Sequence, residues 1–305
     1  MTHENILKLI EKNLATYRKY LSTNKIEAFR LIANTNYLLP IAVDIYKDNA
    51  VIHVFGKIDA ETKTALQIAI TKTLGVENFY YKDKTAHSSD SSRKSGTEKE
   101  AAIEHKEIVV TEYGNKFSIN LSDYLDVGLF LDHRETRKWI MAESKGKNVL
   151  NTFAYTGSFS VFAATGGAQL THSVDLSKTY CAWMKKNFEL NNMPLEKHWV
   201  FKMDTLEYFN YAARKKLVFD IIIIDPPTFS RNKNQTFSVQ KDHPKLINGA
   251  LQILSPTGFI VFSNNCKDFW LQKNKLMPCK VQERTDLIPP DFENQTPHRC
   301  FIISR

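Results

Sequence analysis

Short apolar runs that end in an acidic residue dominate the second half of the chain. Residues 221–224 are four consecutive isoleucines, and Asp225 follows them directly. A run that is apolar at every position is typical of a strand buried on both faces of a parallel sheet. Further strands are predicted at 147–153, 172–175 and 199–204, and they are separated by helical patterns at 161–164 and 178–190. This alternation predicts a doubly wound α/β sheet.

Three of these strands have an aspartate at the carboxyl end, namely Asp175, Asp204 and Asp225. Open α/β sheets bind ligands beyond the carboxyl ends of their strands, where a carboxylate accepts hydrogen bonds from hydroxyl or amino groups. Taken alone, each acid is more often the N-cap of the next helix. Three of them at three strand ends favour a nucleoside ligand, with Asp175 facing the ribose and Asp204 the adenine amino group.

The loop between the first two strands separates two classes of nucleoside ligand. A dinucleotide calls for a G-x-G-x-x-G turn that receives its pyrophosphate at a helix N-terminus. The loop at 153–158 contains a single glycine, Gly157. This favours a ligand without a pyrophosphate, S-adenosylmethionine, and disfavours a dehydrogenase.

The segment at 225–230 predicts the second half of the site. Pro226 and Pro227 have no backbone N–H and cannot continue a strand, so the chain turns rigidly after Asp225. Phe229 then adds an aromatic face beside a hydrogen-bond acceptor. Such a set suits a flat heteroaromatic base, although a strand that simply stops at a proline turn is the plainer interpretation.

The first part of the chain has a different pattern, which predicts a small α+β domain over residues 1–118. Apolar spacing predicts helices at 6–21 and 60–74, a hairpin of strands at 41–46 and 50–55, and a strand at 78–81. Residues 85–99 are polar and serine-rich, which predicts a loop. Residues 109–110 and 117–120 are expected to bridge into a second domain at 119–305.

Composition and charge indicate which kinds of partner the protein binds. No apolar run approaches the roughly 18 residues that a membrane crossing needs. Four scattered cysteines without metal-ligand spacing predict reduced thiols in a cytoplasmic protein and no metal site. The net charge of +8 divides into +2 over residues 1–120 and +6 over residues 121–305. The more basic half carries the predicted site, which favours a nucleic-acid substrate over a small molecule.

Several motifs together resemble class I S-adenosylmethionine-dependent rRNA methyltransferases, most closely the guanine-N7 half of the bifunctional 23S rRNA methyltransferase K/L family. The motifs lie at 123–134, 151–160, 225–230 and 262–265, with weaker likeness at 42–44, 110–113, 239–243, 291–292 and 298–300. The resemblance implies a Rossmann-like, mostly parallel sheet with an antiparallel last strand, and a smaller N-terminal domain that helps to hold RNA. It also implies 23S rRNA, or a large-subunit assembly intermediate, as the partner.

The resemblance assigns roles to residues by position. The guanine is expected to be held by Asp225, Pro226, Pro227 and Phe229, although Asp225 is equally suited to orienting the cofactor. Arg134 is expected to pair with the methionine carboxylate, against the alternative of a surface ion pair. The cofactor-binding residues implied are Phe130, Asp132, Arg134, Asn151, Phe153, Tyr155, Thr156, Gly157, Asp175, Leu176, Asp204, Thr205 and Asp225.

Three alternatives fit the same pattern of strands. A cytosine-C5 methyltransferase needs a thiolate nucleophile, and the resembling sister family carries it in a Ser-Cys-Ser run. Here the matching residues are Ser263, Asn264 and Asn265, with Cys266 displaced just before a helix expected to start at Lys267. An adenine-N6 enzyme also uses Asp-Pro-Pro, but with the aromatic residue directly after the prolines. A non-catalytic RNA-binding or ribosome assembly factor is the third alternative.

Overall fold

The structure, a computed structural model, describes residues 3–35, 39–85, 106–231, 236–284, 286–292 and 295–305. These residues form two compact units, Met1–Leu131 with Pro289–Gln295, and Asp132–Ile288 with Thr296–Arg305. The boundary expected at residue 118 falls within strand β6 (Asn115–Asn120), which pairs with β5 (Glu107–Glu112) as an antiparallel hairpin. The chain therefore leaves the first unit only after Leu131. Residues 86–105, where a polar loop is expected, lie outside the described residues.

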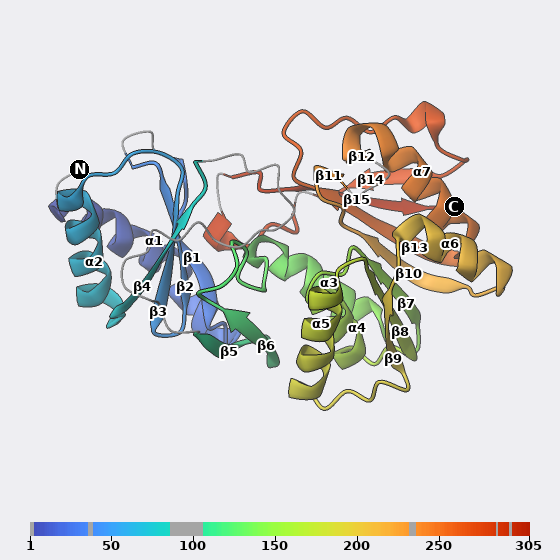
Figure 1. The fold of residues 1–305 in the computed structure, drawn as a ribbon, viewed down its shortest axis with the longest axis horizontal. Coiled ribbons are helices and arrows are strands. Elements are labelled where there is room, and N and C mark those ends of the chain that lie inside the picture. The colour runs from blue at the N-terminus through green and yellow to red at the C-terminus, as the bar shows by residue number, and fades with distance from the viewer. Residues whose placement is uncertain (1–2, 36–38, 86–105, 232–235, 285, 293–294) are drawn as a thin grey trace. The chain divides into compact units, whose positions relative to one another are not determined.

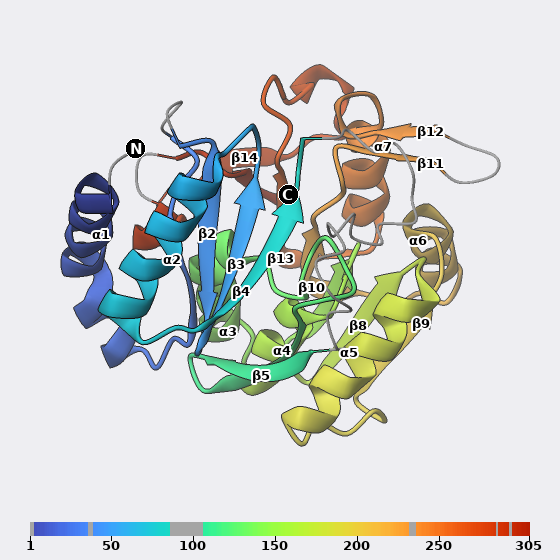
Figure 2. The ribbon, with the colours of Figure 1, turned by 60° about the vertical axis from the view of Figure 1, so that its left-hand side comes forward.

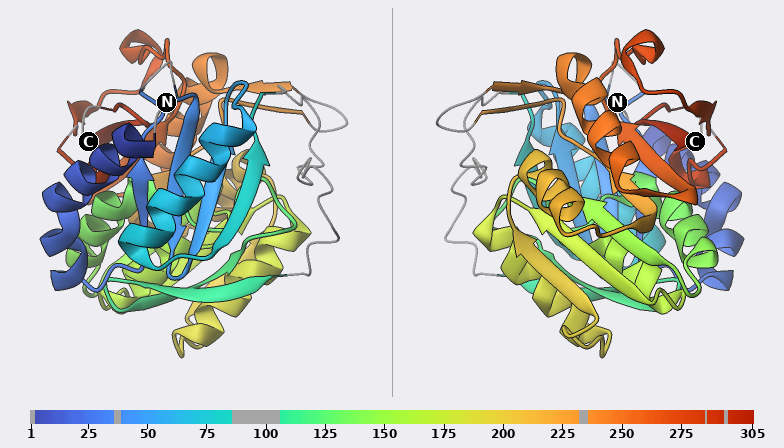
Figure 3. Two further views of the ribbon diagram at one scale, coloured as in Figure 1. Left: turned by 90° about the vertical axis from the view of Figure 1, so that its left-hand side faces the viewer. Right: turned by 90° about the vertical axis from the view of Figure 1, so that its right-hand side faces the viewer.

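The first unit is a four-stranded sheet covered on one face by two helices, as Figure 2 and the left panel of Figure 3 show. The sheet order is β1-β2-β3-β4, with β3 and β4 parallel and the other pairs antiparallel. Ile6, Ile10 and Leu14 of α1 are buried against Leu66 and Ile70 of α2 and the apolar side chains of the strands. The elements are α1 His3–Thr23, β1 Ala28–Ile32, β2 Ile41–Tyr46, β3 Asn49–Val54, α2 Ala60–Leu74, β4 Asn78–Asp83 and the short helix η3 Pro290–Phe292, besides β5 and β6.

The second unit is the predicted α/β sheet. Its seven strands have the order β14-β15-β13-β10-β7-β8-β9, in which only β15 runs antiparallel to its neighbours. The elements are η1 Leu131–His133, α3 Arg134–Glu143, β7 Asn148–Thr152, α4 Ser158–Thr165, β8 Leu170–Asp175, α5 Lys178–Leu190, β9 His198–Lys202, α6 Thr205–Arg214, β10 Phe219–Ile224, β11 Phe229–Arg231, β12 Thr236–Ser238, α7 Val239–Gln252, β13 Leu254–Asn264, η2 Lys273–Lys275, β14 Lys280–Glu283 and β15 Arg299–Ser304. The predicted fold class, including the antiparallel last strand, is confirmed.

The isoleucine run shows why both faces of the sheet are covered. Successive side chains of a strand point to opposite faces. Ile222 and Ile224 join a core with side chains of α6 and α7, whereas Ile221 and Ile223 join one with α3 and α4. Figure 1 shows α6 and α7 on one side of the sheet and α3, α4 and α5 on the other.

The order of the strands fixes where a ligand binds. From β7 the chain proceeds outward to β8 and β9, then returns to the other side of β7 to form β10. Connections that leave two adjacent parallel strands in opposite directions open a crevice at the carboxyl ends of those strands. The site is therefore expected between the loops that follow β7 and β10. None of the described helices combines the length and apolarity needed to cross a membrane.

Candidate active site

The loop after β7 is held in an unusual backbone conformation. Phe153, Tyr155 and Gly157 have φ of 53°, 51° and 80°, in the left-handed region that favours glycine. A Cβ atom added to Gly157 would lie 2.8 Å from Cγ of Met184 in α5. Gly157 is therefore required both by its φ and by the close approach of α5. Ala154, Thr156 and Gly157 are buried, and the aromatic side chains of Phe153 and Tyr155 are partly exposed.

Asp175, at the carboxyl end of β8, ties this loop to the next one. Its Oδ2 accepts a hydrogen bond from the Tyr155 backbone N–H at 2.9 Å, and its Oδ1 accepts one from Ser177 N–H at 2.8 Å. Burial raises the pKa of Asp175, and these backbone donors oppose the rise by favouring the carboxylate. A carboxylate oxygen can accept two hydrogen bonds. Asp175 can thus fix the loop and still receive ribose hydroxyls.

Two buried asparagines support the loop from behind. Asn151 is 2% exposed, and its Nδ2 donates to Ser160 Oγ at 3.0 Å. The Asn151 Nδ2 is thus bonded to α4, and a contact of Asn151 with the cofactor stays a prediction. Asn187 of α5 is fully buried and donates from Nδ2 to the Thr156 carbonyl at 2.9 Å. Sequence reasoning missed this role because the two residues are 31 positions apart.

The ends of β8 and β9 add an apolar surface and a second acid. Leu176 is 53% exposed directly after Asp175, although it is apolar. Asp204 is the N-cap of α6, and its Oδ1 accepts from the backbone N–H groups of Leu206 at 2.8 Å and Glu207 at 3.3 Å. Thr205, the first residue of α6, is buried. In the structure Asp204 therefore acts as a helix N-cap, which was the plainer alternative for each aspartate. Its contact with adenine stays a prediction.

The loop after β10 presents side chains. Asp225 Oδ1 accepts a hydrogen bond from Ser263 Oγ of β13 at 2.6 Å, so the carboxylate is oriented from the neighbouring strand. Pro226 is buried and Pro227 partly buried, whereas Phe229 is 67% exposed. This half of the site combines a fixed acceptor, a rigid proline segment and an exposed aromatic face, which is the set that the sequence predicts for a planar base.

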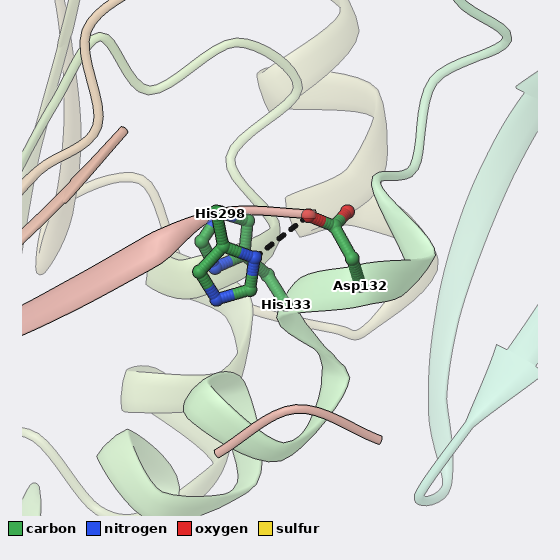
Figure 4. A group of neighbouring side chains, drawn as sticks. All are labelled: Asp132, His133 and His298. Atoms are coloured by element: carbon green, nitrogen blue, oxygen red, sulfur yellow. Dashed lines mark hydrogen bonds and ion pairs between the residues drawn. The ribbon is translucent and has the colours of Figure 1, made fainter. Parts of the chain in front are cut away.

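Behind Asp225 lies a pair of stacked imidazole rings, drawn in Figure 4. His133 Nε2 is 3.4 Å from Asp225 Oδ2, and its ring stacks on that of His298, with the ring centroids 3.8 Å apart. His298 Nδ1 is 2.8 Å from Asp132 Oδ2. Burial and the neighbouring His298 lower the pKa of His133 to about 4, so the ring is neutral at pH 7. His298 lies 166 residues from Asp132 in the sequence, and only the fold brings the two together.

Asp132, His133 and His298 also meet the distance condition for a metal site, since one ligand atom of each lies within 4.8 Å of the others. A metal ion binds imidazole in the plane of the ring, along the nitrogen lone pair. The planes of the stacked rings are inclined by only 22° with their centroids 3.8 Å apart, so the lone pairs lie in two separate, nearly parallel planes and do not converge on one point. This arrangement favours a hydrogen-bonded, stacked pair, and the absence of a metal stays a prediction.

Phe130 and Arg134, two of the predicted cofactor-binding residues, lie on either side of the boundary between the two units. Phe130 belongs to the first unit and is 42% exposed there. Arg134, the first residue of α3 in the second unit, is fully buried, so a solvent-exposed surface ion pair is excluded. Cys266 follows β13 without the helix that the sequence predicts at Lys267, because Lys267 and Asp268 form a turn and residues 269–272 have no regular structure. That expectation is wrong, and the Cys266 thiol does not lie at a helix N-terminus.

Comparison with known proteins identifies the family. The model of the S-adenosylmethionine-dependent methyltransferase family matches residues 82–297. The chain belongs to this family. The ribosomal RNA large subunit methyltransferase K of Neisseria meningitidis serogroup B is 36% identical over 303 residues, which cover 96% of this chain and 84% of that protein. The ribosomal RNA large subunit methyltransferase K/L of Shewanella sp. strain ANA-3 is 38% identical over 97% of this chain, but the match covers only 43% of that longer protein.

Solved structures agree with the family assignment. The crystal structure of SMU.776 complexed with SAH has a TM-score of 0.81 and 29% identity, covering all of this chain and 82% of that one. A tRNA m1G37 methyltransferase of M. jannaschii, at 18% identity and a TM-score of 0.58 over 97% of this chain and 77% of that one, shares the fold alone. The predicted cofactor, S-adenosylmethionine, and the predicted enzyme class are confirmed.

The residues at the carboxyl edge fit this cofactor. Asp175 retains acceptor capacity beyond its two backbone bonds, and Leu176 beside it offers an apolar contact. The loop at Gly157 has positive φ at Phe153, Tyr155 and Gly157, so its conformation is set before any ligand binds. The roles of the individual predicted site residues stay predictions.

Proposed function

We propose that this methyltransferase modifies 23S rRNA, and that its target atom is N7 of a guanine. The observation that carries the proposal is the match, over 96% and 97% of the chain, to proteins named as large-subunit rRNA methyltransferases K and K/L. The basic second half of the chain, with +6 of the net charge, supports a phosphate-rich substrate. The cytoplasm, where rRNA is made in bacteria, is the proposed location.

The chemistry at guanine N7 agrees with the groups that the site provides. When bound, S-adenosylmethionine supplies an electrophilic methyl group attached to a sulfonium. Guanine N7 has a lone pair and carries no proton, so the new N–C bond forms as the C–S bond breaks and nothing has to be deprotonated. The site accordingly needs to align the nucleophile rather than to supply a strong base, and alignment alone can contribute several kcal/mol.

Asp225 and Phe229 are the residues proposed to align the base. A carboxylate matches the N1–H and N2–H₂ donors of guanine, and Ser263 Oγ holds the Asp225 carboxylate in a fixed orientation. The exposed ring of Phe229 supplies a stacking surface for a base extruded from its helix. His133, neutral and 3.4 Å from Asp225 Oδ2, is proposed to support the carboxylate from behind.

The test is to incubate the protein with 23S rRNA that lacks modifications and with isotope-labelled S-adenosylmethionine, and to identify the labelled nucleoside by mass spectrometry. Labelled 7-methylguanosine is the expected product. Label found only in 5-methylcytidine or N6-methyladenosine would reject the proposal. Cys266→Ala distinguishes guanine-N7 methylation from the cytosine-C5 alternative, because an N7 enzyme keeps its turnover and a C5 enzyme loses it.

The first unit is proposed to help hold the RNA.

A further inference from the structure

The segment after β13 carries an exposed tryptophan that the proposed function does not use. Among the described large hydrophobic residues, Phe229 at 67% and Trp270 at 59% are the two most exposed. An exposed indole leaves a large apolar surface in water, which is unfavourable unless a ligand covers it. Phe229 already has a proposed partner in the target base, and Trp270 has none.

The tryptophan is presented by a fixed loop. The side-chain amide of Gln240 in α7 makes two hydrogen bonds to the backbone of Trp270. Gln240 Oε1 accepts from the Trp270 N–H at 3.0 Å, and Gln240 Nε2 donates to the Trp270 carbonyl at 3.1 Å. The carbonyl of Phe269 accepts a hydrogen bond from Arg299 Nη1 at 2.6 Å, and Gln272 N–H donates to His243 Nε2 at 3.1 Å. Phe269 itself is buried. Little further conformational entropy would therefore be lost when a ligand stacks on the indole.

Both exposed aromatic residues belong to the same edge of the sheet. Strands β10 and β13 are parallel neighbours, with Ile224 opposite Phe262, so the loops after them leave the sheet side by side. A hydrogen bond of 2.6 Å from Thr228 Oγ1 to Asn265 Oδ1 connects these two loops. Trp270 therefore lies in the loop after β13, which is next to the loop that holds Asp225.

The charge around this loop suits a polyanion. The segments 240–250 and 265–277 contain five exposed lysines and two acids, Asp242 and Asp268. Lys245 Nζ pairs with Asp242 Oδ1 at 3.6 Å, so the remaining lysines outnumber the one remaining acid, Asp268. The lysines are Lys241, Lys245, Lys267, Lys273 and Lys275. Aromatic faces set among basic side chains are the means by which proteins bind single-stranded nucleic acid.

We propose that Trp270 is a stacking platform for an unpaired base of the RNA strand that carries the target nucleotide. This inference rests on the proposed RNA substrate, and it adds a residue that contacts a base other than the one methylated. Stacking is available to any base, so Trp270 adds affinity for unpaired RNA with little preference for sequence. A protein partner is disfavoured by the excess of exposed lysines in the segments 240–250 and 265–277.

The experiment compares Trp270→Ala and Trp270→Phe with a matched control, Trp199→Phe. Trp199 is also exposed, at 39%, but lies on β9, at the far end of the sheet order from β13. Loss of one stacked base corresponds to about a 5- to 150-fold loss of affinity. Trp270→Ala is therefore expected to raise KM for 23S rRNA by such a factor with kcat nearly unchanged, whereas Trp270→Phe and Trp199→Phe stay close to the native protein.

A second measurement does not depend on methylation. Binding of a single-stranded oligoadenosine of about ten nucleotides is expected to quench tryptophan fluorescence in the native protein and in Trp199→Phe, and far less in Trp270→Phe. The affinity of S-adenosylmethionine, measured by calorimetry, should be equal in all variants. Unchanged KM in Trp270→Ala together with unchanged quenching in Trp270→Phe would overturn the inference, as would a loss of cofactor affinity or thermal stability that accounts for the effect.

The two proposals fail in different ways. If the native protein binds the oligonucleotide through Trp270 but yields no 7-methylguanosine, the methylation target is wrong and the stacking role stands. If 7-methylguanosine forms and the Trp270 variants behave as the native protein, only the stacking role is overturned. A native protein that binds no RNA would overturn both.

Discussion

The loops after β7 and β10 lie at the same edge of one sheet and are built on opposite plans. The loop after β7 is shaped by backbone, with positive φ at Phe153, Tyr155 and Gly157 and with Asp175 and Asn187 bonded to its main chain. The loop after β10 is shaped by two prolines and offers a side-chain carboxylate and an exposed ring. A cofactor that is the same in every turnover suits a rigid cradle, whereas an RNA base that arrives from a folded substrate needs side-chain groups that are accessible.

Removing the carboxylate of the second loop should have the largest effect on catalysis. Asp225→Ala deletes an acceptor proposed to hold two donors of guanine, and each charged hydrogen bond contributes about 1.5–3 kcal/mol. We expect kcat/KM for 23S rRNA to fall by at least about 100-fold. Cofactor affinity measured by calorimetry should be unchanged. A fall in cofactor affinity with unchanged RNA affinity would instead place Asp225 in the first half of the site.

Removing the exposed ring should have the next largest effect. Phe229→Ala deletes a stacking surface worth about 1–3 kcal/mol, so KM for RNA should rise by about 5- to 150-fold. Because Phe229 is 67% exposed, the free energy of unfolding should change by less than about 0.5 kcal/mol. Val218→Ala, at a position of the second unit that is 50% exposed directly before β10, is the matched control. Equal effects of the two substitutions on KM would remove Phe229 from the base site.

The backbone plan of the first loop predicts sensitivity to a single methyl group. Gly157→Ala places a Cβ atom at positive φ and against Met184, which should lower the free energy of unfolding by about 1–3 kcal/mol and weaken binding of S-adenosylmethionine. Gly167→Ala is the control, since Gly167 has φ of +84° but an added Cβ atom would lie 3.7 Å from its nearest neighbour, Cγ of Lys145. Thermal unfolding and calorimetry separate the two effects. Cofactor affinity that falls equally in both variants would contradict the proposed role of Gly157.

The buried histidine pair predicts a pH dependence of stability. The pKa of His133 is about 4 in the folded protein and 6.5 in the unfolded chain, so the unfolded state binds more protons between these values. Stability is therefore fully present above pH 6.5 and is lost as the pH falls toward 4, by up to about 1.4 kcal/mol per pH unit. His172, with a pKa of about 4, acts in the same direction. Denaturant titrations should show a smaller slope with pH in His133→Gln, and an unchanged slope would show that His133 is not the group that titrates.

Removing metal ions should have the smallest effect, namely none. The stacking of His133 on His298 leaves no common point for their lone pairs, so activity should survive dialysis against a chelator. Elemental analysis of the dialysed protein gives the independent check. Activity that disappears on dialysis and returns with a divalent ion would show that this cluster, or another, binds a metal.

Local pattern was sufficient for the elements that the core surrounds. The isoleucine run, the helix that begins after Ser177 and the end of the strand before Pro226 each carry their cause within a few residues, and the structure confirms all three. Strand β1 was missed because its short sequence becomes a strand through pairing with β2, whereas the β5–β6 hairpin is a local pairing whose alternating pattern was interpreted only as a bridge between domains. The helix predicted at Lys267 was wrong for a related reason.

The segment that follows Cys266 is held by hydrogen bonds with Gln240, His243 and Arg299, which belong to other elements. Such bonds cannot be predicted from the local hydrophobic pattern. The site divides in the same way. The aspartates at strand ends could be predicted, since parallel strands end at a common edge. The hydrogen bonds from Ser263 to Asp225 and from Asn187 to the Thr156 carbonyl depend on packing between elements.

The reversed direction of β15 has a practical consequence. Because this strand runs against its neighbours, its first residue, Arg299, pairs with Asn264 at the edge where the other strands finish, and Ser304 pairs with Phe259 toward the opposite edge. The main chain therefore leaves the sheet on the side remote from Asp225 and Trp270. A fluorophore or an affinity handle joined after Arg305 would stand clear of the catalytic edge of the sheet, so surface immobilisation through that end is the geometry of choice for the RNA-binding measurements.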